Sequence, residues 1–176
     1  MITVRQYAPS DMAIWNDFNA GARNGLFIFN RGFMDYHSDR FSDCSLIVSS
    51  DEGVLALMPA HRSGTALVSH GGLTFGGLIL GSKVRASHVI SVLESVVSAV
   101  RAFGIRLVTY KQIPPIFYAP LSGEDSYALF RIGARQVRVD ANFVVEMHNM
   151  TLLQDRRRRS VGKARKAGVS IVRSRD

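Results

Sequence analysis

The sequence is poor in the residues that mark several common classes of protein. A single cysteine, Cys44, excludes an intramolecular disulfide and fits a reducing, cytoplasmic location. Cys44 also falls in a predicted strand with no histidine at a suitable spacing, which argues against a thiol nucleophile. No stretch approaches about eighteen uninterrupted apolar residues, and the start of the chain has no apolar signal-peptide core. We therefore expect a cytoplasmic protein with no membrane span.

Motifs for metals and nucleotides are also missing. The five histidines are scattered and show no metal-ligand spacing, so we expect no metal. The run HGGLTFGGLIL from His70 lacks both the spacing of a dinucleotide fingerprint and the ending of a Walker loop. Its paired glycines instead indicate bulges or a close approach of the backbone.

Positive charge is concentrated at one end of the chain. The formal net charge is +8, yet residues 155–176 carry nine Lys/Arg against two Asp, whereas residues 1–154 carry thirteen against twelve Asp/Glu. Residues 1–154, the body of the chain, are therefore nearly neutral, and the basic character of the whole chain comes from its tail, residues 155–176. With 176 residues and 47% hydrophobic content, the chain can bury one good core.

Hydrophobic spacing and breakers predict an alternating α/β order. The expected helices are residues 10–19, 30–41, 86–103 and 124–132, followed by a basic helix from residue 156. The expected strands are residues 3–7, 44–49, 54–61, 66–69, 105–111, 134–147 and 169–172. Asp51-Glu52-Gly53 is predicted to close a hairpin between the second and third of these strands.

Five separated segments carry a family resemblance. They are MDYHSDRF from residue 34, HGGLTFGGLIL from residue 70, YKQIP from residue 110, YALFRIGA from residue 127 and RRRRSVGKARKAGV from residue 156. In this order they resemble the FemAB-like branch of the GNAT acyltransferase superfamily, over nearly the whole chain. The resemblance implies an α/β (α+β) fold, with a GNAT-like mixed, mostly antiparallel central sheet flanked by helices.

The same resemblance implies a function. It is the transfer of an acyl or aminoacyl group to an amine of a peptidoglycan or surface-polysaccharide precursor. The donor would be acyl-CoA, such as acetyl-CoA, or aminoacyl-tRNA, bound mainly by a second domain. Because family members hold two GNAT-like domains, we expect residues 1–150 to be the first and residues 151–176 to begin a truncated second one. Whether the chain is active by itself stays open, and an exposed interdomain surface would favour a homodimer.

His37 and Arg40 are the first candidates for substrate binding. They lie three residues apart on the predicted helix 30–41, where they could hold an anionic substrate such as a phosphosugar. The alternative is an ordinary helix surface on which Asp35 and Asp39 are their partners.

His70 and Lys111 are the next candidates. His70 precedes a glycine pair and could act as acid or base for an attacking or leaving amine, or simply bond a loop carbonyl. Lys111 ends a predicted strand, where α/β proteins tend to place ligands, and could bind a phosphate or carboxylate or else stay solvated. No residue is assigned as the general base.

The basic run has several interpretations. Residues 159–164, RSVGKA, fit the GNAT pyrophosphate-loop pattern, but no strand precedes them and no apolar helical face follows. The run could instead be a solvated helix face, or Arg158, Arg159 and Lys163 could bind phosphates of a nucleotide-linked precursor or tRNA. Two further hypotheses are a non-catalytic domain that binds nucleic acid or other phosphates through this tail, and a remnant without activity.

Overall fold

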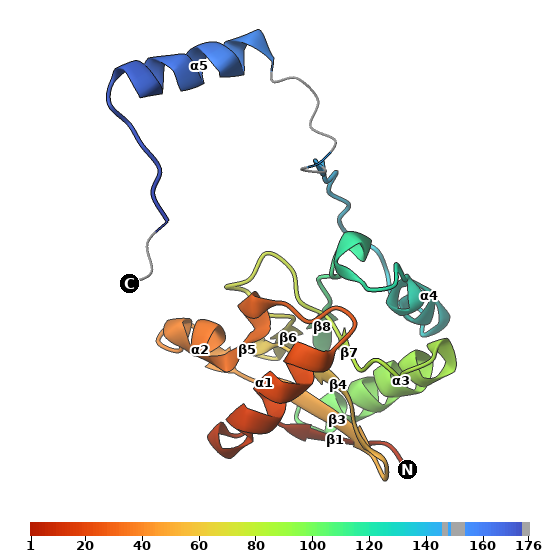
Figure 1. Ribbon diagram of the computed structural model, residues 1–176. Helices are drawn as coiled ribbons and strands as arrows, with labels where there is room; N and C mark the ends of the chain where they lie inside the picture. The colour runs from red at the N-terminus through yellow and green to blue at the C-terminus, as the bar shows by residue number, and fades with distance from the viewer. Residues whose placement is uncertain (146–147, 149–153, 174–176) are drawn as a thin grey trace. The chain divides into compact units, whose positions relative to one another are not determined.

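The computed structural model describes residues 1–145, 148 and 154–173. The chain divides into two compact units, Met1–Arg135 and Gln136–Asp176, and each is described by itself. Every strand among the described residues belongs to the first unit, together with helices α1 to α4, and the second unit contains α5 (Figure 1). The boundary that the sequence predicts, between residues 150 and 151, lies outside the described residues.

The first sheet has four strands in the order β1-β3-β4-β7, and all neighbours are antiparallel. Their bounds are Thr3–Gln6 for β1, Leu46–Ser50 for β3, Gly53–Met58 for β4 and Ile79–Leu80 for β7. The predicted hairpin between β3 and β4 is confirmed, and Gly53 adopts the positive φ of 122° that its turn requires.

The second sheet has the order β2-β5-β6-β8, and in it β6 and β8 run parallel. The bounds are Ser42–Asp43 for β2, His61–Ser63 for β5, Ala66–Val68 for β6 and Leu107–Thr109 for β8. The predicted strand over residues 54–61 is interrupted between β4 and β5 at Pro59, which has no N–H for a ladder. Next to it, the Ala60 N–H donates to the Ser45 hydroxyl at 3.2 Å. The strands therefore form two four-stranded sheets with mostly antiparallel pairing.

Helices cover both faces of the first sheet (Figure 1). Their bounds are Met12–Gly21 for α1, Arg31–Met34 for α2, Ala86–Ala102 for α3 and Glu124–Arg131 for α4. Short 3-10 turns occupy Pro9–Asp11, Phe27–Phe29, Asp35–His37 and Pro115–Phe117. The spacing in α3 confirms its prediction, since it buries Val89, Val92, Leu93, Val96 and Val100.

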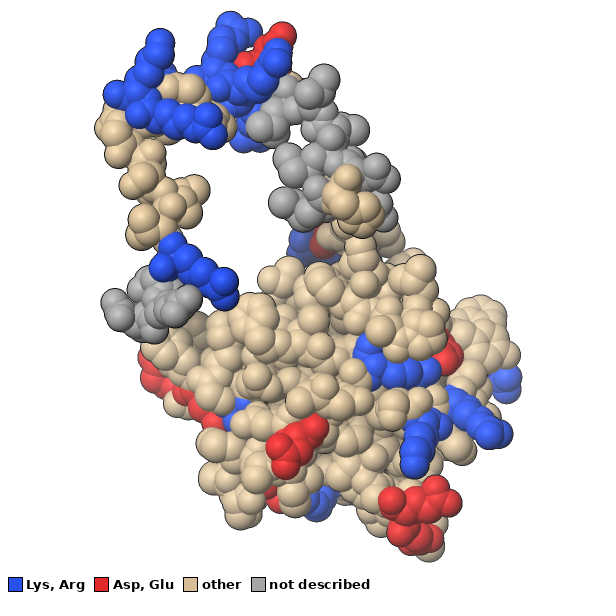
Figure 2. Space-filling model, in the orientation of Figure 1, with Lys and Arg blue, Asp and Glu red and all other residues tan. Residues whose placement is uncertain are grey.

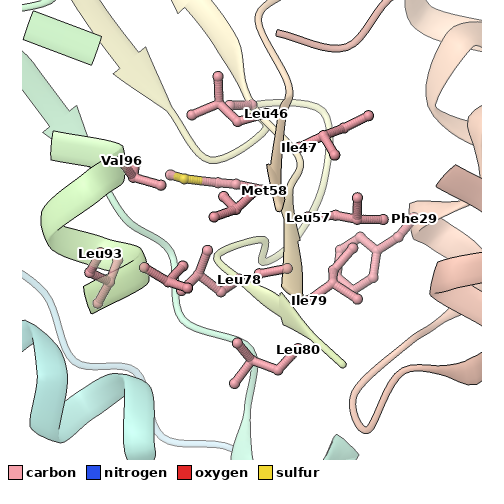
Figure 3. Packing of buried hydrophobic residues seen from close by; sticks show 14 of the residues in the cluster. Phe29, Leu46, Ile47, Leu57, Met58, Leu78, Ile79, Leu80, Leu93 and Val96 are labelled. Atoms are coloured by element: carbon pink, nitrogen blue, oxygen red, sulfur yellow. The ribbon is translucent and has the colours of Figure 1, made fainter. Parts of the chain in front are cut away.

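The core lies on both sides of the first sheet. In the register of β3 and β4, Leu46 pairs with Met58 and Ile47 pairs with Leu57. Because side chains alternate along a strand, the first pair points toward α3 and the second toward Phe29 on the opposite side (Figure 3). All five side chains are fully buried.

Trp15 anchors α1 to this core. Its side chain is fully buried, and its Nε1 donates to the carbonyl oxygen of Phe29 at 2.7 Å. Its ring also meets Tyr7 edge to face, with centroids 5.4 Å apart.

Several predicted elements are shorter or absent. The helix expected over residues 30–41 is limited to α2 and one 3-10 turn that ends at His37. Residues 134–145 form no strand although their apolar residues alternate, because no neighbouring strand pairs with them among the described residues; residues 146 and 147 lie outside the described set. Residues 169–172 likewise form no strand.

The second unit contains the predicted basic helix, α5, which spans Asp155–Lys166. Residues 159–164 lie inside this helix, so their backbone N–H groups, including that of Gly162, bond within the helix and do not line a pyrophosphate loop, in agreement with the surroundings of the pattern. Within the described parts of the chain, no helix is long and apolar enough to cross a bilayer.

Candidate functional site

The candidate site is a glycine-rich loop, residues 69–76, that leaves the carboxyl end of β6. At its start the Ser69 N–H donates to the Thr109 carbonyl oxygen at 2.9 Å, and at its end the Gly76 N–H donates to the Lys111 carbonyl oxygen at 2.9 Å. Because β6 and β8 are parallel, their carboxyl ends meet at one edge of the sheet. The loop is therefore attached at its start to the last residue of β8 and at its end to the segment that follows β8.

His70 is the most unusual residue of this loop. It has a positive φ of 24° and is 4% exposed. Its Nδ1 atom is fully buried and has no hydrogen-bond partner among the residues that the structure describes. Burial, with the nearby His61, lowers the pKa of His70 to about 4, so the ring is neutral at physiological pH. A buried ring nitrogen without a hydrogen-bond partner is uncommon in folded proteins and marks His70 as a residue whose role needs an explanation.

His61 and Phe41 complete a cluster of three rings with His70. The ring centroids of Phe41 lie 5.0 Å from His61 and 5.3 Å from His70, and the two imidazoles lie 5.9 Å apart. The Gly71 N–H donates to His61 Nδ1 at 2.9 Å. Burial, followed by the charge of Lys111, lowers the pKa of His61. Two neutral imidazoles thus pack edge to face, and both contact the Phe41 ring.

Glycine is required next to this cluster. A Cβ atom on Gly71 would lie 2.6 Å from His61 Cε1, and one on Gly72 would lie 2.7 Å from Phe41 Cε2. Both distances are shorter than real Cβ contacts. The sequence therefore predicts the close backbone approach correctly from its paired glycines.

Lys111 holds the loop through hydrogen bonds from its side chain and its backbone. Its Nζ donates to the carbonyl oxygens of His70 at 2.7 Å and Leu73 at 2.5 Å. Its backbone N–H donates to the Ser69 hydroxyl at 2.6 Å. Burial lowers the pKa of Lys111. The structure therefore brings Lys111 and His70 together, and two of the three ammonium protons already bond the loop.

His37 and Arg40 lie in the turn that leads to Phe41. The His37 ring contacts Tyr36, with centroids 4.9 Å apart, and exposed Arg40 lies 3.8 Å from Asp39. Within the described residues, no hydrogen bond, ion pair or ring contact joins either side chain to His70 or Lys111.

A buried ion network lies close to the loop and was missed by the sequence reasoning. Arg31 is 3% exposed, and its guanidinium lies 3.8 Å from the centre of the Tyr7 ring. Its Nη2 donates to Asp35 at 2.5 Å and to Asp43 at 2.7 Å. Because the Arg31 guanidinium is paired with Asp35 and Asp43 and stacks on Tyr7, it fixes the position of the segment that leads to Phe41.

His61 was also missed, although the sequence contains a signal for it. The turn Ser63-Gly64-Thr65 joins β5 to β6 with a positive φ of 60° at Gly64, and the resulting register pairs His61 with Val68. His61 is thereby placed across the sheet from the start of the glycine-rich loop. The glycine at position 64, between two short apolar-containing runs, is the sequence signal for this hairpin and therefore for the position of His61.

The outer edge of β7 is closed by side chains of the same unit. Asn24 Nδ2 donates to the Leu78 carbonyl oxygen at 2.8 Å, and the Leu80 N–H donates to Asn24 Oδ1 at 2.8 Å. The Leu78 N–H donates to the Tyr110 hydroxyl at 2.8 Å. Tyr110 in turn donates to buried Asp125, whose pKa is raised by burial. Asn24 thus makes the hydrogen bonds that a further strand would make.

The basic helix α5 carries the predicted phosphate-binding residues. Arg156, Arg159, Ser160 and Lys163 line a shallow hollow of about 440 Å³ along one face of this helix. Arg158 bonds Asp155 and does not line this hollow. Figure 2 shows Lys and Arg side chains gathered along the helix. A second hollow, of about 210 Å³, lies in the first unit between Asn19 and Asn30. Neither hollow includes His61 or His70.

Metal ligands are not clustered in the part of the chain that the structure describes. There, no group of three or more His, Cys, Asp or Glu side chains lies in position to hold an ion. Cys44 is buried, and burial raises the pKa of its thiol.

Comparisons with known proteins address the fold. No protein-family model matches the chain, and no curated protein matches it in sequence. Among solved structures, the chain is similar to the ribosomal-protein-S18-alanine N-acetyltransferase from Escherichia coli, with a TM-score of 0.54 and 9% identity over 85% of this chain and 87% of that one. It is also similar to the aminoglycoside acetyltransferase AAC(6′)-Iy in complex with a CoA-containing bisubstrate analogue, with a TM-score of 0.53 and 12% identity over 83% of this chain and 99% of that one. The chain therefore has the mixed α+β fold of the GNAT acetyltransferases, as the resemblance of its segments implies.

Proposed function

We propose that this chain acts in N-acyl transfer as a FemAB-like GNAT protein. The donor is acyl-CoA, such as acetyl-CoA, or aminoacyl-tRNA, and the acceptor is an amine of a peptidoglycan or surface-polysaccharide precursor. The fold supports this proposal by analogy only, because one fold serves many reactions. The observation that carries it is a pair of neutral imidazoles. His70 lies on the loop at the carboxyl ends of β6 and β8, and His61 lies beside it on β5.

The proposed reaction is a direct attack on the donor. The acceptor nitrogen attacks the thioester carbonyl carbon, a C–N bond forms, the C–S bond breaks, and CoA leaves as its thiolate. The proton released by the amine passes to the neutral His70 imidazole and then to the thiolate, so that the products are an amide and a thiol. With a pKa of about 4, the protonated His70 ring is a strong enough acid to give the proton readily to the departing thiolate.

The donor is proposed to approach along the loop and not along β7. Extended ligands with amide groups pair readily with an open sheet edge. The outer edge of β7 is already paired with Asn24 and Tyr110, so such pairing would first have to break these bonds.

The acceptor is proposed to contact His37 and Arg40. Both lie in the turn that precedes Phe41, which packs on His61 and His70. Arg40 is exposed and loosely paired, so it is free to bind a phosphate or carboxylate of the precursor. Lys111, in contrast, is proposed to act on substrate only by holding the loop.

Release of free CoA tests this function. The full chain is mixed with acetyl-CoA and a panel of amino sugars and amine-bearing peptides, and thiol formation is followed. We expect release that depends on the acceptor and falls about 10²-fold or more in His70→Ala. The matched control, His88→Ala, changes an exposed histidine of α3 and should retain full activity. Wild-type protein that neither releases nor binds CoA would contradict the proposal.

A second candidate function is phosphate binding by α5. Its support is the hollow in which Arg156, Arg159 and Lys163 converge with Ser160 on one face of the helix. Three converging cations suit the backbone of tRNA or of another nucleic acid, with Arg158 withdrawn by Asp155.

Fluorescence anisotropy with a labelled RNA tests the second candidate. We expect affinity to fall with salt, by about 0.7 in log K per log salt for each neutralised phosphate. Replacing Arg156, Arg159 and Lys163 by Gln should abolish binding. Replacing Lys83, Arg101 and Arg106 by Gln removes the same charge from the first unit and should not. Binding that ignores salt, or that both triple variants lose equally, would rule out α5 as the site.

A further inference from the structure

The hydrogen bond between Gly71 and His61 fixes the position of a proton. The Gly71 N–H points at His61 Nδ1 over 2.9 Å, so Nδ1 must offer its lone pair. A neutral imidazole has one N–H and one lone pair, and the proton of His61 therefore lies on Nε2. The sequence reasoning assigned no role to this residue.

The surroundings of His61 keep it neutral. A second proton would have to sit on Nδ1, where it would face the Gly71 N–H and break the hydrogen bond. The charge of Lys111 also opposes a second charge, and the ring packs on neutral His70 and apolar Phe41. The charged residue opposite His61 in the strand register is Asp43, whose carboxylate is bonded to Arg31 and Ser45. Because the Gly71 N–H occupies the lone pair of Nδ1, His61 is poorly suited to accept a proton and well suited to donate a hydrogen bond through Nε2.

The Nε2–H of His61 is available to a ligand. His61 is only partly buried, and within the described residues its one hydrogen bond is that from Gly71 to Nδ1. Its neighbours Gly71 and Gly72 are exposed and carry no side chain, so a ligand can approach the ring over bare backbone.

We infer that His61 is a fixed hydrogen-bond donor, through Nε2–H, to the carbonyl oxygen of the acyl group. This inference rests on the proposed function and divides the work between the two imidazoles: His70 accepts the proton of the amine, and His61 bonds the oxygen. When the amine adds to the carbonyl carbon, the C=O electron pair moves onto oxygen, and the donor stabilises that negative charge. The electron pair on oxygen re-forms the C=O bond as the C–S bond breaks and the thiolate leaves.

Nuclear magnetic resonance tests the proton position without any enzymatic activity. In the full chain labelled with ¹⁵N-histidine, long-range proton–nitrogen correlations distinguish the two neutral tautomers of each ring. At about pH 7 we expect His61 to carry its proton on Nε2 alone. A proton on Nδ1, a rapidly averaged ring or a charged ring would overturn the inference and leave the proposed function standing.

Acetyl-CoA added to the same sample, without an acceptor, tests the partner. We expect the His61 Nε2–H resonance to move on binding. Acetyl-CoA that binds by calorimetry and leaves this resonance unmoved overturns the donor role alone. No binding at all overturns the proposed function and, with it, the carbonyl partner, whereas the tautomer result is unaffected.

Two near-isosteric variants separate the two nitrogens of His61. Asn places an acceptor where Nδ1 lies and can still receive the Gly71 N–H, but it has no donor at the ε position. Gln places a donor near Nε2. We expect His61→Asn to lower kcat about 10²-fold or more with little change in KM, and His61→Gln to recover much of the loss. Equal kcat values in the two variants would contradict the donor role.

Discussion

The Lys111 ammonium lies 2.7 Å from the carbonyl oxygen of His70 and bonds the Leu73 carbonyl as well. Hydrogen bonds from a charged donor are each worth about 1.5 to 3 kcal/mol. We expect Lys111→Met to lower the free energy of unfolding by about 2 to 3 kcal/mol and to speed hydrogen exchange in residues 69–76. Urea unfolding and exchange mass spectrometry measure these effects. Lys83→Met, at an exposed lysine, should leave both unchanged; loop exchange that is equally slow in both variants would contradict the holding role.

The pKa of His70 makes stability depend on pH. Its folded value, about 4, lies below the unfolded value of about 6.5, so the unfolded chain binds the proton first as pH falls. The stabilisation is complete above about pH 6.5 and is lost progressively down to about pH 4. We expect a loss of about 2 kcal/mol over this range, less than the full shift would give because water reaches the neighbouring His61.

Comparison of variants isolates the contribution of His70. Urea unfolding at a series of pH values should show this loss in wild type and in the control His88→Gln, and should show less of it in His70→Gln. A difference between wild type and His70→Gln that stays constant with pH would mean that the His70 ring is not held neutral by the fold.

Gly71→Ala places a methyl group 2.6 Å from His61 Cε1 and 3.0 Å from Phe41 Cε1. The rings must move, and the hydrogen bond from residue 71 to His61 is lost. Overpacking of this kind costs about 1 to 3 kcal/mol, which thermal or urea unfolding detects. Gly32→Ala is the matched control in α2, because nothing lies within 4 Å of its Cβ. It should be neutral or slightly stabilising, and equal losses in the two variants would refute the close approach.

Asn24→Leu removes both hydrogen bonds that close the β7 edge. The Leu78 carbonyl and the Leu80 N–H then remain buried without partners, at about 1 to 3 kcal/mol each. We expect a loss near 3 kcal/mol in urea unfolding. Asn24→Asp keeps the acceptor for Leu80 but turns an oxygen toward the Leu78 carbonyl, so it should lose at least as much at neutral pH. The exposed Asn142→Leu should cost almost nothing; an Asn24→Leu variant as stable as this one would show that the edge needs no closure.

Elements defined by local pattern were predictable from the sequence. The apolar spacing of α3 and the glycine turn of the β3–β4 hairpin are written in neighbouring residues, and both are confirmed. The strand expected over residues 134–147 depends on a partner, and alternation alone does not provide one. The hydrophobic pattern therefore predicted an element correctly where neighbouring residues determine it, and incorrectly where a distant partner strand is needed.

The site was only partly predictable for the same reason. His70 and Lys111 stood out because one adjoins a glycine pair and the other ends a strand, and the structure joins them. His61 and Phe41 reach His70 through the pairing of β5 with β6 and through the turn after α2. Such contacts follow from register and loop geometry, which single-residue patterns do not record.

Trp15 is the only tryptophan of the chain, and it lies fully buried in the first unit. Its fluorescence is therefore an intrinsic reporter of that unit alone, free of any signal from the basic tail. An emission maximum that shifts to the red on addition of urea would follow the opening of the contact between α1 and Phe29. Stability measurements on this chain thus need no added label, and they read the part of the molecule that carries His61 and His70.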